Sequence, residues 1–213
     1  MKSLITITAL TFVGMAHAAP QKALRMEFYR GSVQQNVEVE YNSPELKKRS
    51  YETKCQATVG LRITDKSLEL VNGHYNCQDG YVSDPNFRLA IKEGKLYFLD
   101  RTGRLPKDAQ PVGQVTENGF QIALQKSQKV ATGEVKMDEQ GCPSREVERV
   151  ESELVETLSY SFVKTEKGYA MERVETREAL VPVAKRYDQC QIKFVREMVE
   201  SQKTSTVVGE LQK

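Results

Sequence analysis

The sequence has no tryptophan, and aromatic residues make up only 8% of it. β-Barrels of the bacterial outer membrane carry girdles of aromatic side chains at both lipid interfaces, so this shortage argues against a lipid-facing band. Beyond residue 18, no stretch approaches the roughly 20 apolar residues that a membrane-spanning helix requires. We therefore expect the chain after residue 18 to have no membrane span.

Histidine is almost as rare, because the chain contains only His17 and His74. Ser-His-Asp and Cys-His mechanisms need a histidine base, and a single histidine in a predicted strand beside a cysteine is typical of a surface or packed residue. The sequence also lacks a glycine-rich loop of the kind that holds phosphate groups. These absences favour a non-enzymatic function without a cofactor.

No excess of either charge is present, since 31 Lys and Arg residues are balanced by 29 Asp and Glu residues, giving a formal net charge of +2. Such a balance produces no strong field that would attract nucleic acid. We therefore expect no nucleic-acid partner. The same abundance of carboxylates prevents any one acidic pair from standing out as the machinery of a hydrolase.

The first 18 residues have the pattern of an export signal. Lys2 supplies a basic start, residues 4–15 are mostly apolar, and small residues occupy positions 16 and 18. This arrangement is recognised and cleaved by signal peptidase, and we predict cleavage after Ala18. The sequence thus predicts an exported protein, either periplasmic or secreted, with residues 1–18 as the signal peptide.

The remaining chain contains four cysteines, which in an oxidising compartment allow two disulfides in three connectivities. Apolar residues alternate from Cys55 to Ile63, as in a half-buried strand. A tight turn then places Ile63 opposite Leu68, and a bulge near Gly73 shifts the register so that Cys55 faces Cys77. We predict a Cys55–Cys77 disulfide.

The remaining two cysteines, Cys142 and Cys190, are then predicted to form the second disulfide. Metal binding is a poor alternative, because no two cysteines have the short spacing of a zinc site. Oxygen-bearing side chains gather in the turn-rich stretch 78–86, including Asp79 and Asp84, but their spacing matches no EF-hand loop. We predict that this stretch is a plain loop without a metal.

Other segments indicate further hairpins. Alternation over residues 24–28 and 37–41 predicts a first hairpin around Gly31, and residues 87–98 predict another around Gly94. The dipeptide at residues 118–119, Asn-Gly, is a strong turn signal, and we expect it to place Val115 opposite Ile122.

The second half of the chain is less regular. The spacing of Val147, Val150, Leu154 and Leu158 predicts an amphipathic helix from about residue 144. The shared parity of Leu158, Tyr160 and Phe162 leaves two alternatives, a shorter helix and one long strand over the whole run. Residues 190–194 resume alternation and predict the last strand. Pro182 indicates that the next connection leaves the centre of the sheet.

Together these features predict a mainly β fold, an antiparallel meander that closes as a barrel or a sandwich, with at most one short helix. We expect a single β-rich domain over residues 19–199, followed by a flexible polar tail over residues 200–213.

For function, the sequence favours a disulfide-stabilised binding module for a small apolar ligand or a protein partner. A ligand cavity would be lined by interior residues such as Leu61, Leu70, Leu89 and Ile122. One alternative is a secreted protease inhibitor that presents the loop at residues 100–111. Another is a carboxylate-based hydrolase, which requires two acidic side chains converging in a cleft.

Overall fold

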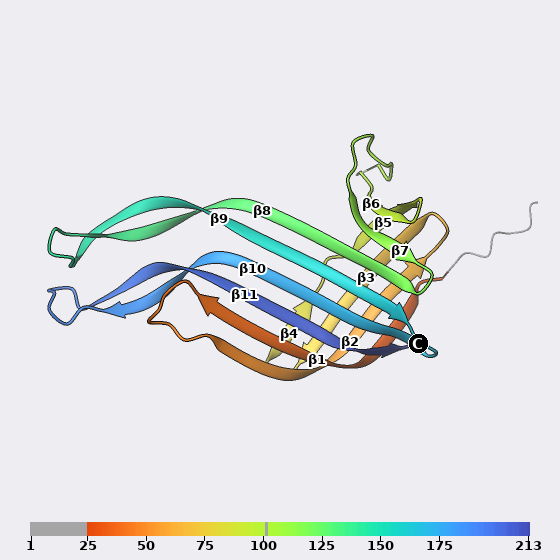
Figure 1. Ribbon diagram of the computed structural model, residues 1–213, viewed down its shortest axis with the longest axis horizontal. Helices are drawn as coiled ribbons and strands as arrows, with labels where there is room; N and C mark the ends of the chain where they lie inside the picture. The colour runs from red at the N-terminus through yellow and green to blue at the C-terminus, as the bar shows by residue number, and fades with distance from the viewer. Residues whose placement is uncertain (1–24, 101) are drawn as a thin grey trace, which may run out of the picture.

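The computed structural model describes residues 25–100 and 102–213, so the predicted signal peptide at 1–18 lies outside the described residues. These residues form eleven β-strands and no helix (Figure 1). The strands are β1 (Glu27–Tyr41), β2 (Arg49–Ile63), β3 (Ser67–Cys77), β4 (Gly80–Ser83), β5 (Phe87–Lys92), β6 (Lys95–Phe98), β7 (Pro111–Thr116), β8 (Gly119–Met137), β9 (Pro143–Lys164), β10 (Gly168–Arg186) and β11 (Phe194–Gln212).

The strands form a closed ten-stranded antiparallel barrel with one extra strand. Neighbours in the sequence pair with each other around the barrel, and β1 closes the ring by pairing with β11. The extra strand, β4, lies along the same edge of β3 as β5 and pairs with the end of β3 that β5 leaves free. The predicted antiparallel meander is confirmed, and it closes as a barrel.

The hairpin of β2 and β3 has the predicted register. Ile63 pairs with Leu68, Cys55 pairs with Cys77, and the register shifts by one residue between these two pairs. At this bulge Asn72 has a φ of 51°, a conformation that asparagine tolerates better than most residues. The disulfide between Cys55 and Cys77 is present. Alternation, turn and bulge were therefore sufficient to align two cysteines 22 residues apart.

The first predicted hairpin is wrong, because β1 runs as one strand through Gly31. A Cβ atom at this position would lie 1.9 Å from the carbonyl oxygen of Glu210 on β11. The glycine therefore serves a close approach between two strands at the barrel seam rather than a turn.

The predicted hairpin of β7 and β8 is present, but its turn and register differ from the prediction. Val115 pairs with Phe120 instead of Ile122. Gly119 is the first residue of β8 rather than part of the turn, and a Cβ atom there would lie 1.8 Å from the carbonyl oxygen of Phe162 on β9. The close approach of β9 thus fixes the glycine in the sheet and moves the turn by one residue.

The predicted helix from residue 144 is also wrong, and the alternative of a long strand is confirmed as β9. Three residues of the helical pattern, Val150, Leu154 and Leu158, have even numbers and so lie on one face of a strand as well. The fourth, Val147, is 64% exposed. Pairing with β8 along the length of β9 satisfies the backbone that a helix would otherwise satisfy internally.

Residues 200–212 belong to β11, so the prediction of a flexible tail is wrong. Val207 and Leu211 are buried in the barrel, and β11 pairs with β10 on one side and β1 on the other. The last strand begins at Phe194 rather than at Cys190, which lies in the preceding turn. Pro182 stays within β10, beyond the last pair of β10 with β9. The edge of β10 that faces β9 has no ladder there, so a proline without an N–H disrupts no hydrogen bond on this edge.

The barrel interior is filled by side chains. Leu61, Leu70, Leu89 and Ile122 are all at most 2% exposed and belong to one core cluster. Aromatic residues from neighbouring strands pack over this cluster, with the rings of Phe120 and Phe162 stacked at 4.7 Å.

Candidate functional site

A charged pair lies inside the barrel. The side chains of Asp84 and Arg173 are 0% and 3% exposed, and Arg173 Nε lies 2.7 Å from Asp84 Oδ1. Tyr75 donates a hydrogen bond of 2.8 Å to the other carboxylate oxygen of Asp84. A second nitrogen of Arg173 donates to Glu175 at 2.8 Å. The buried charges are therefore paired and hydrogen-bonded, as burial in a medium of low polarity requires.

The β-bulge in β3 explains why Asp84 points inward. The strand formed by β4 and β5 is interrupted opposite this bulge, where the Asp84 amide donates to the Gly73 carbonyl oxygen at 2.8 Å. On the other side of the interruption, the Asn72 amide donates to the side chain of Asn86 at 2.7 Å. Bulges of this kind re-aim a side chain. The predicted loop at residues 78–86 is therefore a short strand followed by a break.

This centre contains two polar atoms without partners among the described residues, Arg173 Nη1 and the Tyr160 hydroxyl. Burial and the neighbouring Asp84 raise the pKa of Tyr75 and of Tyr160. Burial opposes the charge of Arg173, but Asp84 and Glu175 raise its pKa above the ordinary value. The arginine therefore stays charged. Its contact with Asp84 joins β10 to the break between β4 and β5 and so stabilises the fold.

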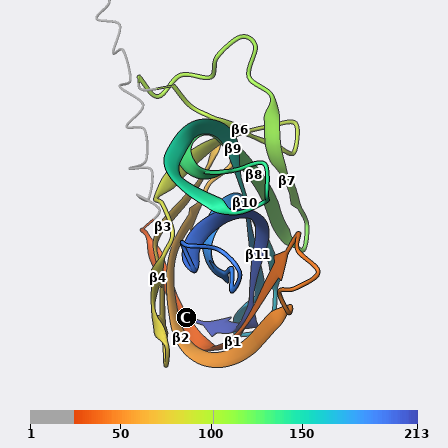
Figure 2. The ribbon, with the colours of Figure 1, turned by 90° about the vertical axis from the view of Figure 1, so that its left-hand side faces the viewer.

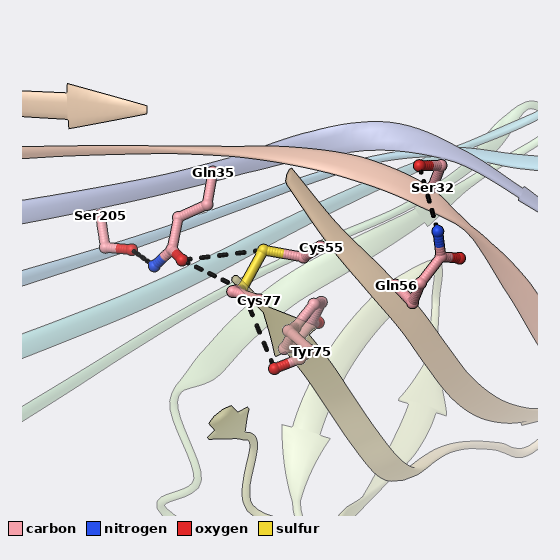
Figure 3. The surroundings of a disulfide bond; sticks show 7 residues. All are labelled: Ser32, Gln35, Cys55, Gln56, Tyr75, Cys77 and Ser205. Atoms are coloured by element: carbon pink, nitrogen blue, oxygen red, sulfur yellow. Dashed lines mark hydrogen bonds between the residues drawn. A yellow bond between two sulfur atoms is a disulfide. The ribbon is translucent and has the colours of Figure 1, made fainter. Parts of the chain in front are cut away.

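The disulfide of Cys55 and Cys77 lies against a second buried polar group (Figure 3). Gln35 Oε1 lies 3.2 Å from the sulfur of Cys77, and Gln35 Nε2 donates to the Ser205 hydroxyl at 2.8 Å. This group connects the β2–β3 hairpin to β1 and β11 at the seam. It is fully enclosed and so reinforces barrel closure rather than forming a site.

Two hairpins extend beyond the barrel, on the left of Figure 1. The β8–β9 arm comprises residues 127–154, which pair with neither β7 nor β10, and the β10–β11 arm comprises residues 179–200, which pair with neither β9 nor β1. The predicted disulfide of Cys142 and Cys190 is present and joins the two tips, with the Cα atoms 5.5 Å apart. The disulfide therefore joins the two arms at their tips.

Both arms have alternating exposure. On the β8–β9 arm, Val150 is half-buried and Leu154 is buried, while the odd-numbered residues between them are exposed. On the strands of the β10–β11 arm, the partly buried apolar residues with odd numbers are Ala179, Val181, Val183, Val195 and Val199, and Leu180 and Met198 are partly buried on the opposite face. Leu154, Tyr160 and Phe162 have the same parity on β9, so this face continues the barrel interior. We call it the inner face of the arms; Figure 2 views the arms from their tips.

At the base of the arms lies a groove of about 760 Å³, lined by residues of β9, β10, β11 and the end of β1. Glu178 is paired with Val155 on one side and with Gln202 on the other, and Gln202 is paired with Glu40. Among residues 25–100 and 102–213, neither lysine nor arginine lines this groove. Its acidic residues are Glu40, Glu151, Glu153, Glu178 and Glu200.

Several of these glutamates accept hydrogen bonds from neutral groups. Asn42 donates to Glu200 at 2.8 Å and Gln202 donates to Glu178 at 3.2 Å. Only Glu40 pairs with a cation, Lys48, at 2.8 Å. The groove therefore has a surplus of negative charge on its walls. The nearly balanced charge of the whole sequence gives no indication of this local surplus.

The other residues singled out in the sequence lie apart from this groove. His74 is hydrogen-bonded to the hydroxyl of Tyr81 through Nδ1, on the outer side of β3. The loop at residues 100–111 connects β6 to β7, and its first turn is held by Asp100, whose side chain accepts amide hydrogen bonds from Thr102 and Arg104 at 2.8 and 2.9 Å. The inhibitor and hydrolase hypotheses stay predictions.

Among residues 25–100 and 102–213, no group of three or more His, Cys, Asp or Glu side chains has the arrangement of a metal site. The same ranges contain no helix with the length and hydropathy of a membrane span.

The arms and the groove were missed by sequence reasoning. The one available signal was the shared parity of Glu151 and Glu153 on a strand whose opposite face carries Val150 and Leu154. Comparisons with protein-family models, with curated proteins and with solved structures found no match for this chain.

Proposed function

We propose that this protein is an exported binding module in which the barrel is a rigid scaffold and the two arms bind a protein partner. The observation that supports this proposal best is the length of the arms. The strands β8 to β11 have 19 to 22 residues each, and over residues 127–154 and 179–200 they form two-stranded ribbons.

Such ribbons are unfavourable for stability by themselves. A two-stranded hairpin in water is marginally stable, and long open strand edges promote unwanted association. The arms also expose large apolar side chains, since Val147 is 64% and Phe194 67% exposed. Elements that contribute so little to the core, and that carry a disulfide at their tips, are better explained by a contact made with another molecule.

The filled interior favours a protein partner over a small apolar ligand. Ligand-binding barrels keep a cavity of several hundred Å³, whereas Leu61, Leu70, Leu89 and Ile122 are packed in the core cluster here. Two disulfides fit an oxidising compartment, either the periplasm or the outside of the cell.

Photo-cross-linking tests this proposal. A photoreactive amino acid at Val147 or at Phe194, on the arms, is expected to give a discrete heavier adduct in the compartment to which the protein is exported. The matched controls are Val163 and Val208, which are 49% and 42% exposed on the barrel wall. Adducts of equal yield from all four positions, or from the wall alone, would contradict a role for the arms. Native mass spectrometry that finds a bound small molecule would favour the ligand hypothesis instead.

A further inference from the structure

We infer that the open edge of β9 in the β8–β9 arm accepts an extended segment of the protein partner as an added strand, and that this segment alternates basic and apolar residues. The inference rests on the proposed function and specifies the chemistry of the partner.

The first step is the position where pairing stops. β9 and β10 pair up to Val155 and Glu178 and no further. Both strands nevertheless continue in extended conformation, β9 back to Pro143 and β10 on to Arg186. Two strand edges with unpaired backbone groups therefore border the space between the arms, and an open edge of this kind is where extended peptides add to a sheet.

The second step identifies which edge is available. Natural proteins protect open edges with lysine and proline. The open edge of β10 has Pro182 and Lys185, and the outer edge of β8 has Lys126, Lys129 and Lys136. Residues 144–154 of β9 contain neither lysine nor proline. The outer edge of β11 over residues 194–200 lacks both as well, but it contributes only Glu200 to the acidic groove, whereas β9 contributes residues 150–153. The edge of β9 is thus the one that is both free of lysine and proline and part of the groove.

The third step derives the side chains of the added strand. Successive residues of a strand point to opposite faces, so half of the added side chains lie beside each face of β9. On the outer face they meet Glu151 and Glu153, which belong to the acidic groove. On the inner face they meet Val150 and Leu154, which are half-buried and buried. Opposite charges and apolar pairs across strands are favourable, so the residues of the segment beside positions 150–154 are basic on the outer face and apolar on the inner face. Glu148 and Arg149 come directly before these positions and end this pattern.

The fourth step is the charge of the whole groove. Glu40, Glu178 and Glu200 extend the acidic surface across three further strands, and no Lys or Arg lines it. Complementary charge steers association and fixes register, and its contribution decreases as salt screens it. A basic segment is therefore favoured over an acidic one along the part of the groove formed by Glu151, Glu153, Glu178 and Glu200.

The test uses a synthetic peptide of about six to eight residues, the usual length of a strand, in which Lys and Val alternate. We expect it to bind the disulfide-bonded protein, as measured by fluorescence anisotropy, and to bind less tightly as salt is raised. A peptide of the same composition with all Lys residues before all Val residues is the control for alternation. N-methylation of the peptide at alternate amides is the control for backbone pairing, and one of the two alternate sets is expected to abolish binding.

The matched protein variants reverse charges. Glu151→Lys with Glu153→Lys is expected to weaken binding by about tenfold or more. Glu172→Lys with Glu210→Lys, at exposed positions of the barrel wall, is expected to leave binding within about twofold. Equal binding of the two peptides, or equal effects of the two pairs of variants, would overturn the inference. If the arms cross-link to a partner while the alternating peptide fails to bind, the added strand is wrong and the role of the arms stands.

Discussion

Cys142 and Cys190 lie at the tips of different hairpins and are joined by a disulfide, although neither tip pairs with the other through its strands. The disulfide closes a path that leaves the barrel along β9 and returns along β10. It therefore limits how far the arms separate without adding to the core of the barrel.

Removing this disulfide is expected to loosen the arms selectively. In the variant Cys142→Ser with Cys190→Ser, amide hydrogen exchange of residues 143–154 and 179–186 should accelerate by about tenfold or more, because local opening no longer needs the tips to stay together. Amides near Tyr160 and Val207, in the barrel, should keep their protection. Unchanged exchange in the arms would show that ribbon pairing alone holds them in place.

The buried ion pair is expected to behave as a unit. Asp84→Ala leaves the Arg173 charge buried without its main partner, and we expect the free energy of unfolding to fall by about 3 to 5 kcal/mol in urea titrations. Adding Arg173→Met should recover part of this loss, because the second change removes the unpaired charge. If the costs of the two changes simply add, the pairing described for this centre is incorrect.

Two tyrosines of this centre provide a matched pair. Tyr75 donates to Asp84, so Tyr75→Phe should destabilise the protein by about 1.5 to 3 kcal/mol. The Tyr160 hydroxyl has no partner among the described residues, so Tyr160→Phe should cost almost nothing or stabilise the fold. Both effects are measurable by urea unfolding, and equal costs would indicate that the Tyr160 hydroxyl is hydrogen-bonded in solution.

Stability should also depend on alkaline pH. The pKa of both tyrosines is raised in the folded protein from an ordinary value of 10.0, so the unfolded chain loses these protons first. The part of the unfolding free energy that depends on keeping these hydroxyls neutral is complete below about pH 10, and it decreases as pH rises above this value. The measurement is the thermal unfolding midpoint between about pH 8 and pH 11, a range that brackets the ordinary tyrosine pKa of about 10. This midpoint should decrease less with rising pH for Tyr160→Phe than for the unmodified protein. Identical pH profiles would contradict the raised pKa of Tyr160.

The seam between β1 and β11 is expected to be intolerant of a methyl group at Gly31. A Cβ atom there would lie 1.9 Å from the Glu210 carbonyl oxygen, so Gly31→Ala must separate the two strands locally. We expect a loss of about 1 to 3 kcal/mol or more in unfolding free energy. Ser32→Ala is the control, at an exposed neighbouring position. A loss no larger than that of the control would mean that the seam opens without cost.

Sequence-based prediction succeeded where the interacting residues are close along the chain and failed where they are far apart. The register of Cys55 and Cys77 was predictable because a turn and a bulge lie between them in the same hairpin. The inward position of Asp84 was not, since its partner Arg173 is 89 residues away. Likewise, Gly31 and Gly119 are residues of a type that is common in turns. Only the backbone of the neighbouring strand, which passes too close for a Cβ atom, shows why each position is glycine.

The candidate site was harder still to predict. The β8–β9 arm is rich in charged and neutral polar residues, so much of its sequence resembles a solvated loop. What makes Glu151 and Glu200 neighbours of one groove is the pairing of β10 with both adjoining strands, which no local pattern records.

The pairing of β1 with β11 has a consequence for the order of folding. Arg30 is aligned with Gln212, so the first strand to leave the ribosome finds its second neighbour only when the last one has been made. Contacts between such distant residues slow folding, and until they form, β1 and β10 each present a free edge to other chains. Protection of the folding chain from association is therefore most needed in the interval before β11 joins β1 and β10.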